Sequence, residues 1–263
     1  MGTLDRLEPG AGVQVHRDIA YAPGPRGGLD VYAPRDPGQP LPVVIFFYGG
    51  NWNSGSKGDY AWVGKSLARE GYVVVIPDYR VYPQVRWPDF LRDSAKAVGW
   101  ARDHAGQYGG DPRRLALMGH SAGAYNAVDL ALDFRWLAEV GIDPSRDLRA
   151  VVGLSGPYDF LPLRSEELKT IFGPEAQRRD TQPISHVAAG APPMFLATGD
   201  KDDIVDPGNS DRLAAALAAK GGAPQVVHYP KLNHAMTIGA FAAPLGWTAP
   251  VKRDVLAFLK ARL

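Results

Sequence analysis

A serine lies at the centre of a Gly-x-Ser-x-Gly pattern at residues 119–123, directly after an apolar run at residues 115–118. The apolar run predicts a strand, and the alanine-rich run after residue 123 predicts a helix, so Ser121 falls in the turn between them. Gly119 and Gly123 allow strand and helix to approach closely, and the tight turn pushes the serine hydroxyl out above a sheet. Because the helix begins at the serine, its free N–H groups point toward the hydroxyl. These residues predict that Ser121 is a nucleophile.

A serine hydroxyl is a poor nucleophile at neutral pH, so it needs a base within hydrogen-bond reach and an acid that orients the base. Four aspartates lie at residues 200–206, just after a predicted strand at residues 193–198. Asp202 is the preferred acid because of its spacing from Gly199, and Asp203 is the second choice. Asp200 is expected to form a turn. Asp206, which precedes a proline, is expected to cap the next helix.

The base is expected after the last predicted strand, at residues 226–229. His234 is in the loop that follows this strand, and it is the preferred base. His120 is too close in sequence to Ser121 to turn back onto it. The remaining histidines stand in strands, in a helix or in an irregular stretch, away from the expected site: His16, His104, His186 and His228.

A reaction at a carbonyl carbon places negative charge on the carbonyl oxygen, and backbone N–H donors must already point at that oxygen. The first donor is expected from Ala122, next to the nucleophile. The others are expected from the glycine-rich loop after the predicted strand at residues 43–47, where Gly50 and Asn51 are the donors and Gly49 supports them. Large apolar side chains near these loops are candidates for a substrate pocket, with ordinary core packing as the equal alternative: Trp52, Trp87, Phe160, Leu161 and Met236.

Strands alternate with helices along the chain, which predicts a mostly parallel sheet covered on both faces within one domain, residues 1–263. Two antiparallel edge strands at residues 13–21 and 29–33 come first. Residues 157–193 have no regular period, and we expect them to form a small, partly helical cap over the site. The further strands are expected at residues 43–47, 72–76, 114–118, 150–154, 193–198 and 226–229, and further helices at 60–69, 88–100, 210–220 and 250–263.

Composition excludes several classes of protein. The chain has no cysteine, so it has no disulfide, zinc–thiolate site or cysteine nucleophile, which fits a reducing cytoplasm. Its 29 basic and 28 acidic residues form no basic stripe, which argues against nucleic acid as a partner. No apolar run approaches the roughly 18 residues of a membrane span, and the polar residues 1–12 lack the apolar segment of a signal peptide. We therefore expect a cytoplasmic protein that binds neither nucleic acid nor a membrane.

The motifs together resemble the α/β-hydrolase fold, and most closely the carboxylesterases of the hormone-sensitive-lipase-like and kynurenine-formamidase-like group. The resemblance extends from about residue 29 to the C-terminus. It rests on five motifs in the expected order: Tyr48-Gly49-Gly50-Asn51-Trp52 with Gly55-Ser56-Lys57, Asp78-Tyr79-Arg80, Gly119-His120-Ser121-Ala122-Gly123, Gly199-x-x-Asp202, and His234. It implies an eight-stranded sheet, a triad of Ser121, Asp202 and His234, and no cofactor or metal ion. One residue departs from the pattern: Tyr48 replaces the usual histidine before Gly49 and Gly50. We expect the tyrosine hydroxyl to hold the loop in shape rather than to contact the reacting oxygen.

The preferred interpretation is a serine carboxylesterase that hydrolyses short-chain or aryl esters through an acyl-enzyme on Ser121. An arylformamidase acting on N-formylkynurenine would use the same residues on an amide. A catalytically inactive α/β-hydrolase that serves as a binding module is the alternative from another class. The expected partners are a small-molecule ester and, as an option, a second copy of the chain in a homodimer.

Overall fold

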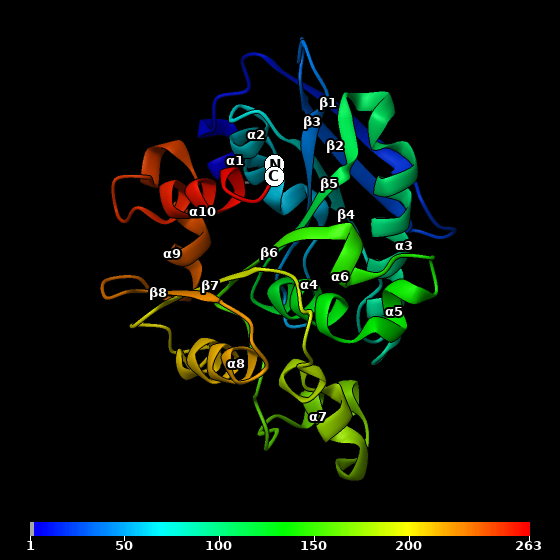
Figure 1. The fold of residues 1–263 in the computed structure, drawn as a ribbon, viewed down its shortest axis with the longest axis vertical. Coiled ribbons are helices and arrows are strands. Elements are labelled where there is room, and N and C mark those ends of the chain that lie inside the picture. The colour runs from blue at the N-terminus through cyan, green and yellow to red at the C-terminus, as the bar shows by residue number, and fades with distance from the viewer. Residues whose placement is uncertain (1–2) are drawn as a thin grey trace.

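A twisted sheet runs through the centre of the molecule in the computed structural model, which describes residues 3–263 (Figure 1). Met1 and Gly2, the beginning of the polar stretch at residues 1–12, lie outside the described residues. Across residues 3–263 the sheet has eight strands in the order β1-β2-β4-β3-β5-β6-β7-β8. They are β1 (Val13–Ala20), β2 (Gly28–Pro34), β3 (Leu41–Phe47), β4 (Val73–Pro77), β5 (Gly110–His120), β6 (Leu148–Leu154), β7 (Met194–Gly199) and β8 (Gln225–Tyr229).

The sheet is parallel except at one edge, and its central strands are buried. β1 and β2 are antiparallel, β2 is antiparallel to β4, and the remaining strands are parallel. In the centre, Val44 of β3 stands opposite Val74 of β4 and Ala116 of β5, and all three are buried. A strand that is covered on both faces has a continuous apolar sequence, which explains why apolar and polar residues do not alternate in β3 and β4.

Helices form a layer on each face of the sheet. α1, α2, α9 and α10 lie on one side and α3, α4, α5, α6 and α8 on the other (Figure 1). The larger helices are α2 (Ala61–Ala68), α3 (Asp89–His104), α4 (Ala122–Leu132), α8 (Gly208–Ala219) and α10 (Val251–Lys260). The short helices are α1 (Thr3–Leu7), α5 (Phe134–Ala138), α6 (Pro144–Asp147), α7 (Glu166–Phe172) and α9 (His234–Gly239), with 3-10 helices at Lys57–Tyr60, Ala105–Tyr108, Glu175–Thr181, Pro183–His186 and Ala243–Leu245.

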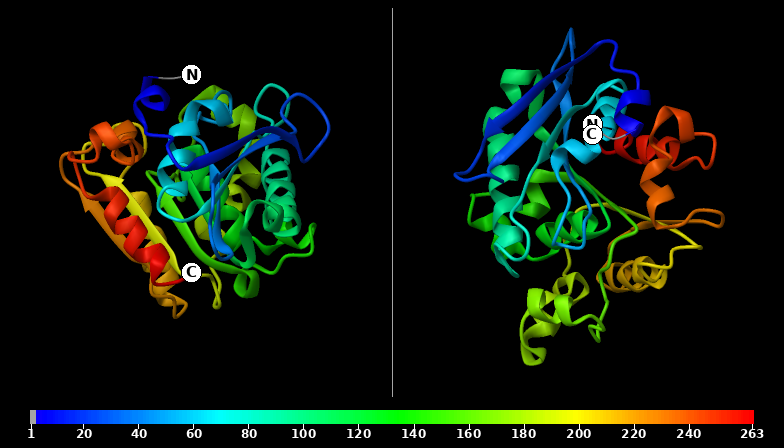
Figure 2. Two further views of the ribbon diagram at one scale, coloured as in Figure 1. Left: turned by 90° about the horizontal axis from the view of Figure 1, so that it is seen from above. Right: turned by 180° about the vertical axis from the view of Figure 1, so that it is seen from behind.

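The segment 157–193, predicted as a cap, contains α7 and two of the 3-10 helices. It extends away from the sheet beyond β6 and α8, as both side views of the ribbon show (Figures 1 and 2). Ser165 begins α7, because its hydroxyl accepts a hydrogen bond from the N–H of Leu168 at 3.4 Å. Asn53 Nδ2 donates to Glu167 at 2.8 Å, which ties α7 to the loop after β3.

The predicted fold class is confirmed, including the two antiparallel edge strands and the helices on both faces. Four short helices were not predicted: α1, α5, α6 and α9. Each of them has between four and six residues, too few for a helical period to show in the sequence. Within residues 3–263, no helix is both long and apolar enough to cross a membrane.

His228 on the edge strand β8 should stabilise the fold in a pH-dependent way. Its Nδ1 lies 2.7 Å from Asp200 and its Nε2 lies 3.1 Å from Asp211. Burial alone would lower the pKa of His228, but the hydrogen bonds to Asp200 and Asp211 outweigh it and raise the pKa above 6.5. A raised pKa stabilises the folded state below pH 6.5, and this stabilisation is lost as pH rises through the folded-state pKa.

We expect His228→Thr to lower the free energy of unfolding by up to about 1 kcal/mol near pH 6, because the pair is partly exposed. The loss should shrink above the folded-state pKa. Urea unfolding at about pH 6 and pH 9 measures both values. His16→Thr on the opposite edge strand β1 is the control, since His16 packs on Tyr108 and contacts no carboxylate within residues 3–263. A difference that grows with pH would contradict the prediction.

Candidate active site

Ser121 stands in a sharp turn between β5 and α4. Its φ is 57° and its ψ is −125°, a conformation that a non-glycine residue rarely adopts and that the surroundings must hold in place. The N–H of Ser121 donates to the carbonyl of Leu154 at 2.9 Å, and its carbonyl accepts from Ala124 and Tyr125. The turn that the sequence predicts is therefore present, and it is anchored on β6 and on α4.

The glycines of the turn are required by close backbone contacts. A Cβ on Gly123 would clash with the carbonyl of Phe47, and a Cβ on Gly119 would clash with the carbonyl of Gly123. β3, β5 and α4 thus approach more closely than side chains would allow. A Cβ on Gly49 would lie 3.0 Å from the Cβ of Ser121, so the loop after β3 passes directly behind the serine.

Asp202 and His234 form a buried hydrogen-bonded pair. His234 Nδ1 lies 2.8 Å from Asp202 Oδ2 and 3.1 Å from Oδ1. Asp202 follows β7 and accepts the N–H groups of Ile204 and Val205 at 3.0 and 2.9 Å. Burial acts to raise the pKa of Asp202, but the hydrogen bonds from His234 and the backbone outweigh it and lower the pKa. The carboxylate therefore stays ionised at neutral pH and holds the proton of His234 on Nδ1.

The other aspartates of this loop have different surroundings. Asp200 pairs with His228, and Asp206 accepts the N–H of Gly208 at 3.1 Å at the start of α8. Asp203, the second choice for the acid, is exposed, while Asp202 is buried beside the histidine. The geometry thus supports Asp202 over Asp203.

His120, the residue before Ser121, contacts His234. Within residues 3–263, the hydroxyl of Ser121 has no hydrogen bond to the imidazole of His234. The neighbouring His120 ring lies 4.9 Å from the His234 ring, and its Nε2 lies 3.0 Å from the His234 carbonyl oxygen. Hydrogen bonds between nucleophile and base are often long before substrate binds.

This contact of His120 with the His234 carbonyl was not expected from the sequence. The carbonyl of His234 can only accept, so His120 Nε2 carries the proton and Nδ1 accepts from the hydroxyl of Tyr60 at 3.2 Å. Burial and the nearby His234 lower the pKa of His120 to about 3, so it is neutral at neutral pH. Thr237 also donates to the His234 carbonyl at 2.5 Å. Only the fold brings these groups together, and no spacing in the sequence indicated them.

The loop after β3, from which the sequence predicts oxyanion donors, has three successive residues with positive φ. Gly50 has φ 138°, and Asn51 and Trp52 have φ 51° and 56°. The carbonyl of Gly50 accepts the N–H groups of Asn53 and Ser54, both at 3.0 Å, which closes the turn. In the described part of the chain, the N–H groups of Gly50, Asn51 and Ala122 make no hydrogen bond, so they are available to a ligand.

Tyr48 lies directly before this loop and is fully buried. Its hydroxyl donates to Asp78 Oδ1 at 3.0 Å and accepts from Arg26 at 3.0 Å. Tyr79 donates to the Tyr48 carbonyl at 2.7 Å, and the two rings stack at 4.6 Å. Burial raises the pKa of the Tyr48 hydroxyl, which stays protonated. These contacts favour the expected role of the Tyr48 hydroxyl, which is to hold the loop in shape.

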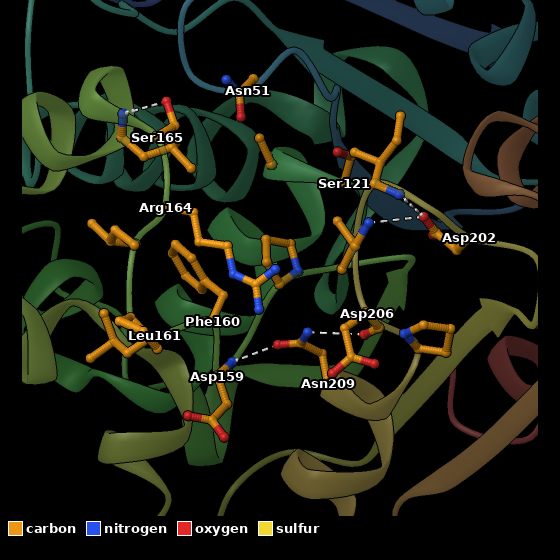
Figure 3. Close-up of a pocket in the computed structure, with 18 of the residues that line it drawn as sticks. Asn51, Ser121, Asp159, Phe160, Leu161, Arg164, Ser165, Asp202, Asp206 and Asn209 are labelled. Carbon is orange, nitrogen blue, oxygen red and sulfur yellow. Dashed lines mark hydrogen bonds between the residues drawn. The ribbon is translucent and has the colours of Figure 1, made fainter.

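A cavity of about 660 Å³ opens in front of Ser121. Figure 3 shows Asn51 and Ser121 on its wall, with Phe160, Leu161 and Arg164 of the segment 157–193 across from them. Ala122, Trp52 and Asp202 also line it. The Trp52 ring stacks on Phe160 at 6.0 Å, so an aromatic wall lies beside the serine.

Two of the expected pocket residues lie elsewhere. Trp87 precedes α3, and its ring packs edge-on against Trp136 of α5 at 6.0 Å, in the outer helix layer. Met236 lies on α9 with its sulfur over Gly239, one turn further along the same helix face. Neither side chain is among those that line the cavity in front of Ser121, which favours for both the packing alternative that the sequence left open. Among residues 3–263, no group of three or more His, Asp or Glu side chains is arranged to hold a metal ion.

A sequence model of the BD-FAE family matches residues 29–217, which include the turn at Ser121, the loop after β3 and Asp202. The chain belongs to the BD-FAE family. Its match begins at the point where the resemblance to α/β-hydrolases begins. His234 lies beyond the matched residues, so its assignment rests on the geometry around Asp202.

This BD-FAE family member is similar to esterases of several organisms. The probable isoprenylcysteine alpha-carbonyl methylesterase ICMEL1 of Arabidopsis thaliana is 31% identical over 242 residues, which cover 84% of this chain and 51% of the plant protein. Esterase LipC of Mycobacterium tuberculosis is 34% identical over 211 residues, 73% of this chain and 52% of LipC. The chain thus spans about half the length of these curated relatives.

A solved structure extends the comparison to the whole fold. Esterase 2 of Thermogutta terrifontis, phosphonylated by sarin, superimposes with a TM-score of 0.74 at 25% identity and covers 95% of this chain and 93% of that protein. The α/β-hydrolase fold expected from the sequence is thereby confirmed for this BD-FAE family member.

Replacing His120 should impair the reaction that the site carries out, here measured on a short-chain ester. We expect His120→Ala to lower kcat about tenfold with KM nearly unchanged, because the His234 backbone loses a hydrogen bond that positions the base. His120→Gln retains an N–H donor and should lose less. Steady-state kinetics together with the melting temperature separate this effect from unfolding. Equal losses in both variants, in step with the melting temperature, would leave His120 with a structural role alone.

Removing the Tyr48 hydroxyl should affect stability more than catalysis. We expect Tyr48→Phe to lower the free energy of unfolding by about 1–3 kcal/mol, because Asp78 and Arg26 lose a buried partner. The value of kcat/KM should fall less than about tenfold, since an oxyanion donor is worth more than that. Thermal unfolding and ester kinetics measure the two effects, with Tyr72→Phe as a control. A larger loss of kcat/KM at unchanged melting temperature would place the hydroxyl on the reacting oxygen.

Proposed function

We propose that the protein is a serine carboxylesterase that hydrolyses short-chain or aryl esters. One observation carries this proposal: Ser121, on a strained turn, lines a cavity that also contains Asp202, whose carboxylate binds His234 Nδ1 at 2.8 Å. A hydroxyl on the wall of a cavity, a buried imidazole and a carboxylate that fixes the tautomer of the imidazole are the three groups that acyl transfer requires.

In the proposed acylation step, His234 Nε2 takes the proton of the Ser121 hydroxyl as the oxygen attacks the ester carbonyl carbon. The carbonyl oxygen becomes an oxyanion, and the N–H groups of Gly50, Asn51 and Ala122 donate to it. Asp202 stabilises the imidazolium that forms. When the tetrahedral intermediate collapses, His234 returns the proton to the leaving alcohol, and an acyl-Ser121 ester remains.

In the proposed deacylation step, a water molecule takes the place of the alcohol. His234 removes a proton from the water as its oxygen attacks the acyl carbon, and the same N–H groups hold the second oxyanion. Collapse of this intermediate releases the acid and returns the proton to Ser121.

The cavity supports a preference for small substrates. Its volume of about 660 Å³ is in the range of small-molecule sites, and its wall beside Ser121 is formed by Trp52, Phe160 and Leu161. These side chains suit a short acyl chain or an aromatic ring. The segment 157–193 that carries Phe160 and Leu161 would then act as the cap of the site.

The named relatives support the same chemistry. The plant relative is described as a methylesterase, the mycobacterial relative as an esterase, and the structural neighbour as an esterase phosphonylated by sarin. By analogy, an organophosphonate should react with Ser121 of this chain. A cytoplasmic location and a homodimer stay predictions from the sequence alone.

Hydrolysis of p-nitrophenyl esters from acetyl to decanoyl tests the proposal. We expect kcat/KM to be highest for the short chains and to fall by at least about 10³-fold in Ser121→Ala, because the nucleophile is lost. N-formylkynurenine is measured beside the esters, and far higher efficiency on it would assign the protein to the arylformamidases instead.

A fluorophosphonate probe, followed by peptide mapping, checks the nucleophile itself. Labelling is expected on Ser121 in the wild-type protein and in Ser185→Ala, whose serine lies outside the cavity, and is expected to be absent in Ser121→Ala. A protein that neither reacts with the probe nor hydrolyses any of the substrates would be a binding module. Ester hydrolysis that persists in Ser121→Ala would contradict the mechanism.

A further inference from the structure

Arg164 is a cation on the wall of the same cavity as Ser121. It lies in the segment between β6 and α7, and its side chain points into the cavity (Figure 3). Across residues 3–263, its guanidinium makes no ion pair or side-chain hydrogen bond. The residue is exposed, and its guanidinium is free to bind a ligand that enters the cavity.

The other charged side chains around the cavity mostly have a hydrogen-bonded or ion-pair partner. Arg212 binds Asp159 at 2.8 Å and Asp206 at 3.0 Å, and Asp202 is bound by His234. In the described residues, the one other wall charge without a partner is Asp203, on the loop after β7. Four aspartates and two arginines line the cavity, and within residues 3–263 Arg164 is the one of these arginines that no carboxylate binds.

The backbone around Arg164 is held on both sides. Leu163 before it is buried, and Ser165 after it caps α7. α7 is joined to the loop after β3 by the hydrogen bond between Asn53 and Glu167 at 2.8 Å. The N–H of Trp87 also donates to the carbonyl of Ile171 in α7 at 3.0 Å. The position of Arg164 relative to the proposed oxyanion donors is thus set by the fold.

We infer that Arg164 binds a carboxylate on the substrate, so that the preferred esters carry a negative charge apart from the scissile bond. This inference rests on the proposed esterase function and names its substrate class. A guanidinium offers two parallel N–H groups that match the two oxygens of a carboxylate. The aromatic and apolar wall of Trp52, Phe160 and Leu161 accommodates the uncharged part of the ester.

Two pairs of substrates of equal shape test the inference. 4-Acetoxybenzoate and 4-acetoxybenzamide differ by a charge on the alcohol side of the ester. Monomethyl adipate and methyl adipamate differ by a charge on the acyl side. For each pair, the ratio of kcat/KM for the anionic ester to kcat/KM for the neutral ester is measured in the wild type and in Arg164→Gln.

In at least one pair, we expect the ratio to fall about tenfold in Arg164→Gln, the order of magnitude of one charge-assisted hydrogen-bonded contact. The value of kcat/KM for the neutral ester should stay within about twofold, which also shows that the variant is folded. Salt at about 0.5 M should lower the wild-type ratio, because it screens the charge of the exposed Arg164. Arg69→Gln, at an exposed arginine after α2, is the matched control and should leave the ratio unchanged.

Ratios that are unchanged in Arg164→Gln for both pairs would overturn the inference, as would an equal fall in Arg69→Gln. Failure of the proposed esterase function would give different results from failure of the inference about Arg164. In that case the neutral esters would not be hydrolysed by the wild type, or they would still be hydrolysed by Ser121→Ala.

Discussion

The close approach of three backbone segments around Ser121 is the constraint on which the rest of the site depends. β3, β5 and α4 meet where Gly119 and Gly123 have no side chain, and any Cβ at Gly123 would clash with the carbonyl of Phe47. The same contact sets the loop after β3 behind the serine, and Asn51 of that loop lines the same cavity as Ser121 and Ala122. The proposed nucleophile and its proposed oxyanion donors are therefore placed by one packing arrangement of main chain, which side-chain motions do not disturb.

The second requirement is that Asp202 stays ionised and His120 stays neutral although both are buried. Asp202 is kept ionised by backbone N–H groups and His234, while burial keeps His120 neutral although it lies beside His234. A charged His120 would repel the imidazolium that the proposed mechanism forms. A neutral His120 instead donates to the His234 carbonyl, so the same burial that removes its charge makes it useful as a positioning group.

The walls of the cavity come from different parts of the fold. The loops at the ends of β3, β5 and β7 supply Asn51, Ser121 and Asp202, whereas the segment 157–193 supplies Phe160, Leu161 and Arg164. Loops at the ends of parallel strands meet at one edge of a sheet, which suits groups that must keep fixed distances. The inserted segment is joined to that edge by a few hydrogen bonds, and its side chains can vary without altering the sheet. We expect it to select the substrate.

The sequence by itself determined the strands, the larger helices, the turn at Ser121 and the order of acid and base along the chain. These features are local, because they follow from apolar periodicity, glycine spacing and the position of loops after strands. The family resemblance added the expectation of a single eight-stranded sheet, and the order of its strands came from the structure. Tertiary structure decided between Asp202 and Asp203, which stand one residue apart in the same loop and differ only in which side chain is buried against His234. It also placed Trp87 and Met236 against other side chains than those that line the cavity, and it brought His120 to the His234 carbonyl. Each of these outcomes depends on the direction of a side chain, and that direction is set by contacts with residues far away in the sequence.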